Sequence, residues 1–589
     1  MRNKLNTKNC PPMLLCDFYK VCHNAMYPDG MTKLVSYLTP RMSRIKGSDF
    51  LISFGMQAFC RTYLHDYFDE FFFNRNKEEV VAEYERILKH SIGEGTYNSE
   101  KIIALYDLGY LPIEIRIIPE GTKVPIKVPM VEISNTHPDF AWVTNAIESL
   151  MSCYLWHPMV CANIGYYYRE IVNYWYNKTV EDNIPRNTAL GDFSMRGQES
   201  LESAITSSAG FALSFLNTAT VPCITYLENN YYCDIEKEPV IKGAVSTEHS
   251  VMCFNYAVDG DETTLVKKLL NKVYPNNNFS MVSDSYDYWN MLTNIIPSCK
   301  EDILNHNGTL IVRPDSGNPV DIVCGELKKS DYMEVDGLTE NIEEIKKYFI
   351  KKAEEDFTGN SDGVWYRVKI ANKLYTVHCD YATEPDIDDP DIYVLTPTVY
   401  PDEVEIECKE ITPARKGSVE VLWDIFGGTI NSKGYKVLNS KIRVIYGDGI
   451  TLTRAKEIYN RLEEKGFASN NVSFGVGSFS HQCMEMPDGS LQPFTRDTYS
   501  IAVKATYGEI NGKPYEIFKN PKTDAGHFKK SQKGCCVVYF DADGDIWYED
   551  GHNWEDSRCG IMKTIFKDSE MVNEDSLSNI RNRLHNNEF

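Results

Sequence analysis

The fold of this chain is decided by three short clusters, Ser246-Thr247-Glu248-His249-Ser250, Val282-Ser283-Asp284-Ser285-Tyr286-Asp287 and Ile311-Val312-Arg313-Pro314-Asp315-Ser316-Gly317-Asn318-Pro319. In each cluster an apolar run ends, and reactive polar groups follow it together with turn-forming residues. Strands of α/β folds deliver such side chains to the carboxyl edge of the sheet, where these folds keep their sites. The clusters therefore predict an α/β fold with a site built at successive strand ends.

A repeated order of short strand, polar loop and helix begins near residue 190. Helical spacing at 263–273 and 453–464 separates several of the strands that we expect, which are Cys223–Tyr226, Met281–Ser283, Thr309–Arg313, Arg443–Tyr446 and Asn471–Phe474. Repeated βα units favour a parallel sheet or barrel.

Both ends of the chain and one internal stretch follow a different pattern. Alternating apolar residues over 113–133 and again after Arg496 indicate antiparallel strands. We therefore expect an irregular parallel α/β barrel over 181–497, and a mostly antiparallel α+β domain over 1–180 that 498–589 completes. Residues 328–415 interrupt the barrel with a charged helix and alternating strands, which predicts an α+β insertion on a loop.

The composition excludes several classes of protein. The 589 residues carry a net charge of -23, which repels nucleic acid. No apolar run reaches the roughly 18 residues of a membrane span, and the first residues lack the apolar core of a signal peptide. Seventeen cysteines without a C-x-x-C pair indicate reduced thiols. We expect a cytoplasmic protein that binds neither membrane nor nucleic acid, and no metal-ligand set can be assigned.

His249 is the candidate reactive residue. It follows the acid Glu248, and Asp284 ends the next strand. A histidine held by a carboxylate can act as a base or as a better nucleophile, although a lone histidine is more often a cap or a structural hydrogen-bonding group. The neighbouring clusters favour the reactive role.

Other strand ends offer groups for sugars, phosphates and flat ligands. Arg313 and Asp315 place a donor fork and a carboxylate at a glycine turn, which suits a phosphate, an amide or sugar hydroxyls. Gly447-Asp448-Gly449 can reach ribose hydroxyls, and Gly475-Val476-Gly477-Ser478 is a natural phosphate cradle. Phe193 and Arg196 offer an aromatic face and a cation to a planar ligand. Each motif is weak by itself, but several at successive strand ends indicate one site.

Taken together, the motifs resemble those of the nicotinamide phosphoribosyltransferases, which belong to the type II phosphoribosyltransferases. The resemblance covers nearly the whole chain except 328–415. The motifs that carry it, in order, are Asp17-x-Tyr19-Lys20-Val21-x-His23, Asp192-Phe193-x-x-Arg196-Gly197, Glu248-His249-Ser250, Ser283-Asp284-Ser285-Tyr286-Asp287, Arg313-Pro314-Asp315-Ser316-Gly317-Asn318-Pro319, Gly447-Asp448-Gly449 and Thr495-Arg496-Asp497.

The resemblance implies a reaction and its partners. Nicotinamide and 5-phosphoribosyl 1-pyrophosphate would give nicotinamide mononucleotide and pyrophosphate, with Mg²⁺ and with ATP as a coupling co-substrate. The protein would be a head-to-tail homodimer with two shared sites. His249 would be phosphorylated by ATP, supported by Glu248 and Asp284.

The resemblance also implies roles for the substrate-binding residues. Phe193 and Tyr19 of the partner subunit would stack on the pyridine ring. Arg196 would hold the nucleotide phosphate, and Arg313 the carboxamide side. The remaining implied groups are Asp315, Gly447 and Asp448 for ribose and pyrophosphate, Gly477 and Ser478 for the 5′-phosphate, and Arg41, Arg496, Lys504 and Lys529 for the phosphate channel.

One departure from the family pattern affects the choice of base. Ala219 stands where the family usually has an Asp that accepts a hydrogen bond from the carboxamide. Losing that acceptor costs about 1–3 kcal/mol of amide recognition and removes a charge hostile to a carboxylate. A nicotinate phosphoribosyltransferase is therefore the close alternative. A phosphohistidine ATPase or phosphotransferase is a remoter one, and a catalytically dead relative is disfavoured by the intact His249 and Asp284.

Overall fold

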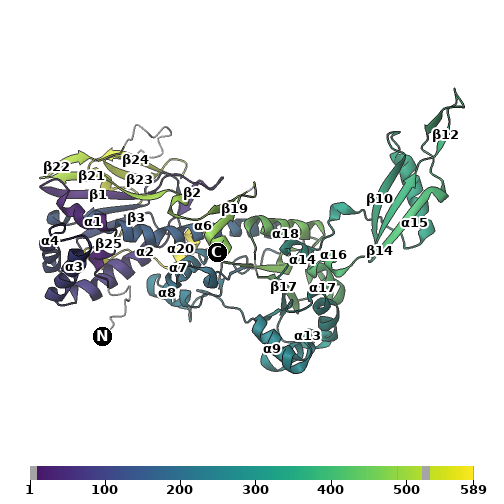
Figure 1. Cartoon of the computed structure of the whole chain (residues 1–589), viewed down its shortest axis with the longest axis horizontal. Helices are drawn as coiled ribbons and strands as arrows, with labels where there is room; N and C mark the ends of the chain where they lie inside the picture. The colour runs from purple at the N-terminus through teal and green to yellow at the C-terminus, as the bar shows by residue number, and fades with distance from the viewer. Residues whose placement is uncertain (1–9, 448, 487, 520–530, 588) are drawn as a thin grey trace. The chain divides into compact units, whose positions relative to one another are not determined.

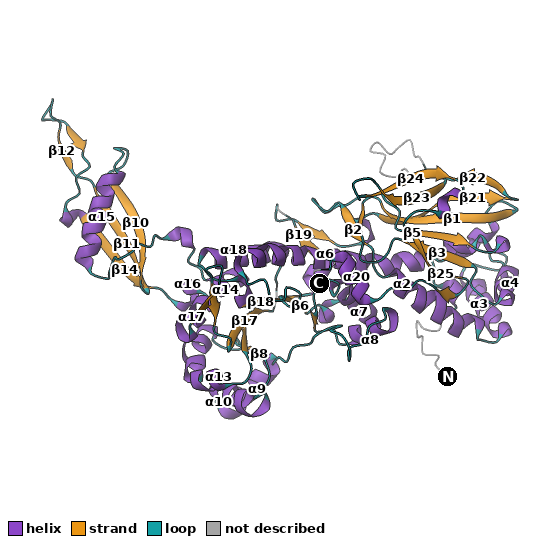
Figure 2. Ribbon diagram, turned by 180° about the vertical axis from the view of Figure 1, so that it is seen from behind, coloured by secondary structure: helices purple, strands orange, loops and turns teal. Residues whose placement is uncertain are grey.

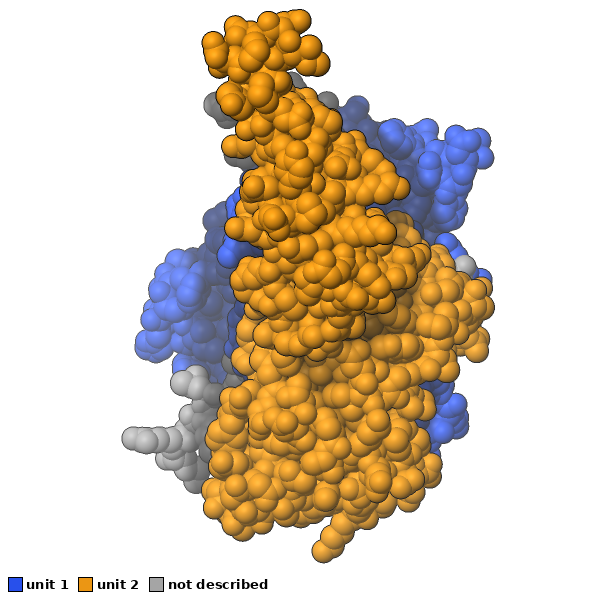
Figure 3. Space-filling view, turned by 90° about the vertical axis from the view of Figure 1, so that its right-hand side faces the viewer, with its two compact units in different colours: residues 1–172, 185–243, 475–589 blue, residues 173–184, 244–474 orange. Residues whose placement is uncertain are grey.

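The computed structural model describes residues 10–447, 449–486, 488–519, 531–587 and 589. The chain divides into two compact units (Figure 3). Unit 1 comprises 1–172, 185–243 and 475–589, and unit 2 comprises 173–184 and 244–474. The chain passes from unit 2 back to unit 1 inside strand β18 (Val472–Val476).

Unit 1 is organised around a seven-stranded sheet made by both ends of the chain. Its order is β22-β21-β1-β5-β3-β25-β26, and its pairings are antiparallel. The strands are β1 (Met31–Pro40), β3 (Ile113–Ile117), β5 (Val131–Asn135), β21 (Ile501–Ile510), β22 (Lys513–Glu516), β25 (Lys563–Lys567) and β26 (Glu570–Met571). The long pairing of β1 with β21 confirms the expected antiparallel domain from the two chain ends.

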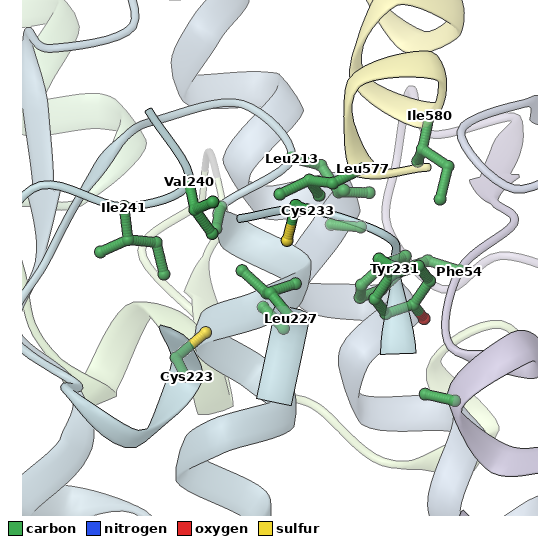
Figure 4. Close-up of a cluster of buried hydrophobic side chains, with 14 of the residues drawn as sticks. Phe54, Leu213, Cys223, Leu227, Tyr231, Cys233, Val240, Ile241, Leu577 and Ile580 are labelled. Atoms are coloured by element: carbon green, nitrogen blue, oxygen red, sulfur yellow. The ribbon is translucent and has the colours of Figure 1, made fainter. Parts of the chain in front are cut away.

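A helical layer in unit 1 supports a pair of short parallel strands. Strand β6 (Leu190–Asp192) pairs in parallel with β7 (Asn217–Thr218), and the N–H of Phe193 donates to Val476 O of β18 at 2.8 Å. Helices α7 (Leu201–Phe211), α8 (Pro222–Asn230) and the C-terminal α20 (Leu577–Leu584) bury apolar side chains in one cluster, in which Leu227, Tyr231 and Leu577 lie together (Figure 4). The last helix of the chain therefore shares a core with α7 and α8.

The expected strand at Cys223–Tyr226 is wrong, because these residues lie in helix α8. Pro222 takes the first turn, where its missing N–H costs nothing. Cys223 and Leu227, four residues apart, both face the core, which is the spacing of a helix.

Unit 2 contains the parallel strands that carry the deciding clusters. Strands β8 (Phe279–Val282), β9 (Leu310–Arg313), β17 (Ile442–Tyr446) and the start of β18 pair in parallel in the order β8-β9-β17-β18. Each strand is within one or two residues of its predicted position. The helices between them are α9 (His249–Asp259), α10 (Thr263–Lys268), α13 (Lys300–Asn305), α14 (Pro319–Cys324), α17 (Ser418–Phe426) and α18 (Leu452–Glu464). The α/β class with parallel strands is confirmed.

The insertion predicted at 328–415 has its own core. Helix α15 (Ile342–Asp356) covers one face of the antiparallel sheet β10 (Gly363–Ile370), β11 (Lys373–Asp380) and β14 (Val404–Glu410), as Figures 1 and 2 show. Phe349, Val368 and Val377 are fully buried in its centre. A hairpin of β12 (Thr383–Pro385) and β13 (Tyr393–Leu395) follows β11. No helix in the described residues is long and apolar enough to cross a membrane.

Candidate active site

His249 begins helix α9, directly after Glu248 at the N-cap position. Its Nε2 lies 3.7 Å from Oδ1 of Asp284, whose side chain is 4% exposed while that of His249 is 53% exposed. A buried carboxylate therefore faces an imidazole that solvent can reach. Such a pair can orient the ring and stabilise its positive form, which suits a nucleophile or a base. Glu248 instead accepts a hydrogen bond from the hydroxyl of Ser250.

Asp284 also holds the loop that follows β9. Its Oδ2 accepts hydrogen bonds from the N–H of Asp315 at 2.8 Å and from the hydroxyl of Ser316 at 2.6 Å. Gly317 then turns the chain with a positive φ of 90°, and the Asn318 side chain caps helix α14. One carboxylate thus connects His249 with the loop that carries Asp315.

The end of β17 closes against this loop. A Cβ placed on Gly447 would lie 2.8 Å from Oδ1 of Asp315 and 3.4 Å from Cδ of Arg313. Only a glycine therefore leaves the carboxylate of Asp315 where it stands. Asp448, the next residue of the predicted ribose-binding motif, lies outside the described residues. We refer to Glu248, His249, Asp284, Arg313, Asp315 and Gly447 as the His249 group.

In unit 1 a second set of predicted residues meets at the ends of β6, β7 and β18. Phe193 and Arg196 lie in the loop after β6, and Gly477 and Ser478 begin the short helix α19 (Ser478–Gln482). The contact between the loop and α19 is close, because a Cβ on Gly197 would lie 2.1 Å from Oγ of Ser478. The side chain of Gln482 donates to Gly197 O at 2.6 Å. The loop that carries an aromatic ring and an exposed cation thus lies against the first residue of α19.

Asp192 is the hub of this second set. It is fully buried, and it accepts hydrogen bonds from Ser194 N (2.9 Å), Ser208 Oγ (2.5 Å) and Thr218 Oγ1 (2.9 Å). The N–H of Ala219 donates to its backbone oxygen at 2.8 Å. The hub thereby fixes the loop before Phe193 and the strand end before Ala219. We refer to Phe193, Arg196, Ala219, Gly477 and Ser478 as the Phe193 group.

His481 is a neighbour of this hub that sequence reasoning missed. Its fully buried ring places Nε2 3.6 Å from Oδ1 of Asp192. Burial lowers the pKa of His481, and the charge of Asp192 opposes that shift. No local pattern marks His481 in the sequence, because its partner lies far away in the chain. Asp192, in contrast, stands inside the quoted motif before Phe193.

The predicted phosphate-channel residues form a third set in unit 1. The register of β1 with β21 places Lys504 opposite Tyr37, and Ile501 opposite Pro40, the residue before Arg41. Burial lowers the pKa of Lys504, Glu148 opposes the shift, and the cations of Arg41 and Arg496 add to it. A lysine whose pKa is lowered by neighbouring cations is poised to receive an anion.

Within the described structure, Tyr19 is connected to Lys504 only through its neighbour Lys20 and the carboxylate of Glu148. Lys20, its neighbour in helix α1 (Phe18–Cys22), forms an ion pair with Glu148, and Glu148 is also 3.9 Å from Nζ of Lys504. The side chain of Tyr19 is 60% exposed. We refer to Tyr19, Arg41, Arg496 and Lys504 as the Tyr19 group. Lys529 lies outside the described residues.

In the part of the chain that the structure describes, no three His, Cys, Asp or Glu side chains cluster in a way that could hold a metal ion. A site of three or more protein ligands is therefore not formed by these residues. The three groups offer instead carboxylates, cations and aromatic faces, the set that a phosphorylated sugar and a flat ring require.

Comparison with known proteins defines the class. Residues 188–367 and 405–586 match the Nicotinate phosphoribosyltransferase (NAPRTase) family, and residues 12–115 match the Nicotinamide phosphoribosyltransferase, N-terminal domain. This chain belongs to the nicotinate phosphoribosyltransferase family and is a phosphoribosyltransferase, a kind of pentosyltransferase. The segment between the two matched ranges lies within the insertion.

The chain is also similar to individual proteins of known sequence or structure. The chain is 33% identical over 588 residues to a nicotinamide phosphoribosyltransferase of Acinetobacter baylyi, with 97% of each chain covered. It is 25% identical over 528 residues to one of Mycoplasma pneumoniae, with 87% of this chain and 92% of that protein covered. The crystal structure of nicotinate-nucleotide pyrophosphorylase from Pyrococcus furiosus has the same fold, with a TM-score of 0.50 and 12% identity over 100% of this chain and 97% of that one.

Proposed function

We propose that this protein makes nicotinamide mononucleotide and pyrophosphate from nicotinamide and 5-phosphoribosyl 1-pyrophosphate, a step of NAD salvage. The observation that carries the proposal is the match to the Acinetobacter baylyi nicotinamide phosphoribosyltransferase, which covers 97% of both chains. The alignment therefore spans nearly the whole of the chain in which the three groups lie. The N-terminal domain match, which includes Tyr19 and Arg41, supports the same base.

The reaction requires what the three groups offer. The bond between ribose C1 and the pyrophosphate oxygen breaks, the leaving pyrophosphate keeps the electron pair, and the pyridine nitrogen bonds to C1. Positive charge develops on the ribose, so Asp315 and Asp448 are proposed to lie beside the sugar. Arg41, Arg496, Lys504 and Lys529 are proposed to neutralise the leaving group, as cations do in phosphoryl sites.

The ring and the nucleotide phosphate are assigned to the Phe193 group. Phe193 stacks on one face of nicotinamide and Tyr19 of the partner subunit on the other, which aligns the nitrogen with C1. Arg196 and the backbone at Gly477 and Ser478 take the 5′-phosphate. Arg313 takes the carboxamide side.

The test is direct: enzyme, nicotinamide and 5-phosphoribosyl 1-pyrophosphate are incubated, and nicotinamide mononucleotide is measured. Phe193→Ala should raise the KM for nicotinamide roughly fivefold or more, because stacking contributes on the order of 1 kcal/mol. Arg196→Ala should lower kcat/KM for the sugar donor. Absence of mononucleotide with the parent enzyme would refute the proposal and favour a phosphohistidine ATPase or phosphotransferase.

Shared sites in a head-to-tail homodimer are part of the proposal. The exposed Phe18 and Tyr19 of helix α1 are available to a second copy. At a nicotinamide concentration well below the KM of either variant, Tyr19→Ala and Phe193→Ala chains should each be strongly impaired. Mixing them should raise the activity to about a quarter of the parent activity, because half of the dimers regain one of two sites. No recovery in dimers shown to have exchanged subunits would contradict sharing.

Mg²⁺ is the proposed metal cofactor, and ATP is the proposed coupling co-substrate. Mg²⁺ usually binds through one or two carboxylates and substrate phosphates, so the lack of a three-ligand cluster in the described residues fits it. Oδ1 of Asp284, which makes no hydrogen bond in the described structure, and the carboxylate of Asp315 are suitable ligands. The ion would neutralise charge on the pyrophosphate.

His249 is proposed to accept a phosphoryl group from ATP, leaving ADP. Its exposed ring and the buried Asp284 behind it support this role. His249→Ala should keep basal transfer and lose the stimulation by ATP. If ATP stimulates that variant as well as the parent, the role of His249 is refuted.

Nicotinate is the alternative base, and Ala219 is the specific observation that favours it. Steady-state kinetics with both bases decide between them, since a large preference for nicotinate would overturn the assignment. We also propose a cytoplasmic location. All seventeen cysteines are free, as expected in a reducing compartment.

A further inference from the structure

The guanidinium of Arg313 is held by the short segment that precedes His249. Nη1 donates to Oγ of Ser246 at 2.8 Å, and Nη2 donates to Thr247 O at 3.1 Å. Nε is buried and makes no hydrogen bond in the described residues. Each terminal nitrogen of Arg313 therefore donates one hydrogen bond to an acceptor in this segment.

The Ser246 hydroxyl is committed to this task. It accepts a hydrogen bond from Ser280 Oγ at 2.5 Å and donates its own proton to Thr247 O at 3.1 Å. Its segment is tied to strand β8, because Ser280 N donates to Val245 O at 2.8 Å and Thr247 N donates to Ser280 O at 3.0 Å. With both acceptor positions and its proton in use, the hydroxyl stays where it holds Arg313.

The distance between the two acceptors indicates which N–H groups of Arg313 donate to them. Ser246 Oγ and Thr247 O are 3.1 Å apart. Acceptors this close match the parallel pair of N–H bonds at the end of the guanidinium, whereas the outer N–H bonds diverge and point to well separated places. The end pair is the one that grips a carboxylate with two bonds. The side pair includes Nε–H, which is buried.

Neither pair of parallel N–H groups, at the end or at the side of the Arg313 guanidinium, is therefore available to bind a ligand with two hydrogen bonds. What remains are single N–H donors that point in different directions. One donor suffices for the carbonyl oxygen of an uncharged carboxamide. A carboxylate loses the paired geometry that makes arginine its preferred partner. Ala219 no longer supplies a charge that repels a carboxylate, so this arrangement would supply the discrimination.

We propose that Ser246 determines the choice of base, by occupying the end fork of Arg313 so that a carboxamide is accepted and a bidentate carboxylate is refused. The inference rests on the proposed function. It deepens that function by assigning selectivity to a residue outside the predicted site.

The test compares kcat/KM for nicotinamide and for nicotinate in the parent, Ser246→Ala and Ser246→Thr. Ser246→Ala frees an end N–H, so the ratio should move toward nicotinate by about tenfold or more, the usual effect of a charge-assisted hydrogen bond. Ser246→Thr keeps the hydroxyl and should keep the parent ratio within about twofold. The KM for the sugar donor should not change in either variant.

A structural role is separated from a selective one by two measurements. Thermal unfolding shows that each variant is folded, and Ser298→Ala, which removes a hydroxyl whose contacts are local, with Ile295 O at 2.6 Å and Cys299 Sγ at 3.8 Å, serves as the matched control. Calorimetric binding of nicotinate should strengthen in Ser246→Ala only. An unchanged base ratio in folded Ser246→Ala overturns the inference. A parent that makes no mononucleotide from either base instead refutes the proposed function.

Discussion

Replacing Asp284 by Ala should impair both basal transfer and ATP stimulation, because this carboxylate connects two parts of the His249 group. Its Oδ2 accepts hydrogen bonds from Asp315 N at 2.8 Å and Ser316 Oγ at 2.6 Å, and its Oδ1 faces His249 at 3.7 Å. Other substitutions in the group remove one connection only.

The magnitude follows from the two bonds to the charged oxygen. Each is worth about 1.5–3 kcal/mol, and neighbouring bonds are not additive. If losing both raises the barrier by about 2–3 kcal/mol, kcat/KM falls roughly 30- to 150-fold. Asp284→Asn keeps an oxygen that can accept both bonds and should lose only about fivefold of basal activity, while its neutral side chain no longer supports His249.

The assay measures initial rates of mononucleotide formation with and without ATP, at several concentrations of the sugar donor. His249→Ala is the matched control, since it should lose stimulation while basal transfer stays within about threefold. Thermal unfolding checks that Asp284→Ala is folded. A folded Asp284→Ala enzyme whose basal rate is within twofold of the parent would refute the reasoning.

Three further predictions follow from packing and charge. Gly447→Ala should lower kcat/KM about tenfold or more with little change in Tm, because its Cβ would lie 2.8 Å from Oδ1 of Asp315; unchanged kinetics would contradict this. Burial raises the pKa of Glu120 to about 7, above its unfolded value, so the folded protein retains the proton longer and stability falls as pH rises from about 4.5 through about 7. The Tm difference between the parent and Glu120→Gln, followed over that range, should therefore change in favour of the variant, and a constant difference would argue against the shift. Glu420→Gln should lower stability by about 2–4 kcal/mol in denaturant titrations, since it removes the negative charge 3.1 Å from the buried Lys465 and leaves that cation only the backbone oxygen of Lys416 as a partner among the described residues; a loss under 0.5 kcal/mol would count against that ion pair.

Some residues and elements can be recognised from a short stretch of sequence, and others cannot. His249, Asp284, Arg313 and Asp315 can be named because each lies at or just after a strand end or begins a helix, and carboxyl ends of parallel strands converge. The insertion could be outlined from its change of rhythm, and its helix and strands occur where alternation and charge place them. The strand expected at Cys223–Tyr226 lies in helix α8 (Pro222–Asn230), because a stretch of only four residues fits both the strand and the helix period.

The motifs and the parallel and antiparallel regions can be predicted from the sequence alone. These depend on local periodicity and on residue chemistry, which are properties of short stretches. The tertiary structure decided the contacts between residues far apart in the chain: Ser246 on the fork of Arg313, Asp284 under the Asp315 loop and His481 beside Asp192. Such contacts are set by how strands and loops pack, and no short stretch records its distant neighbour.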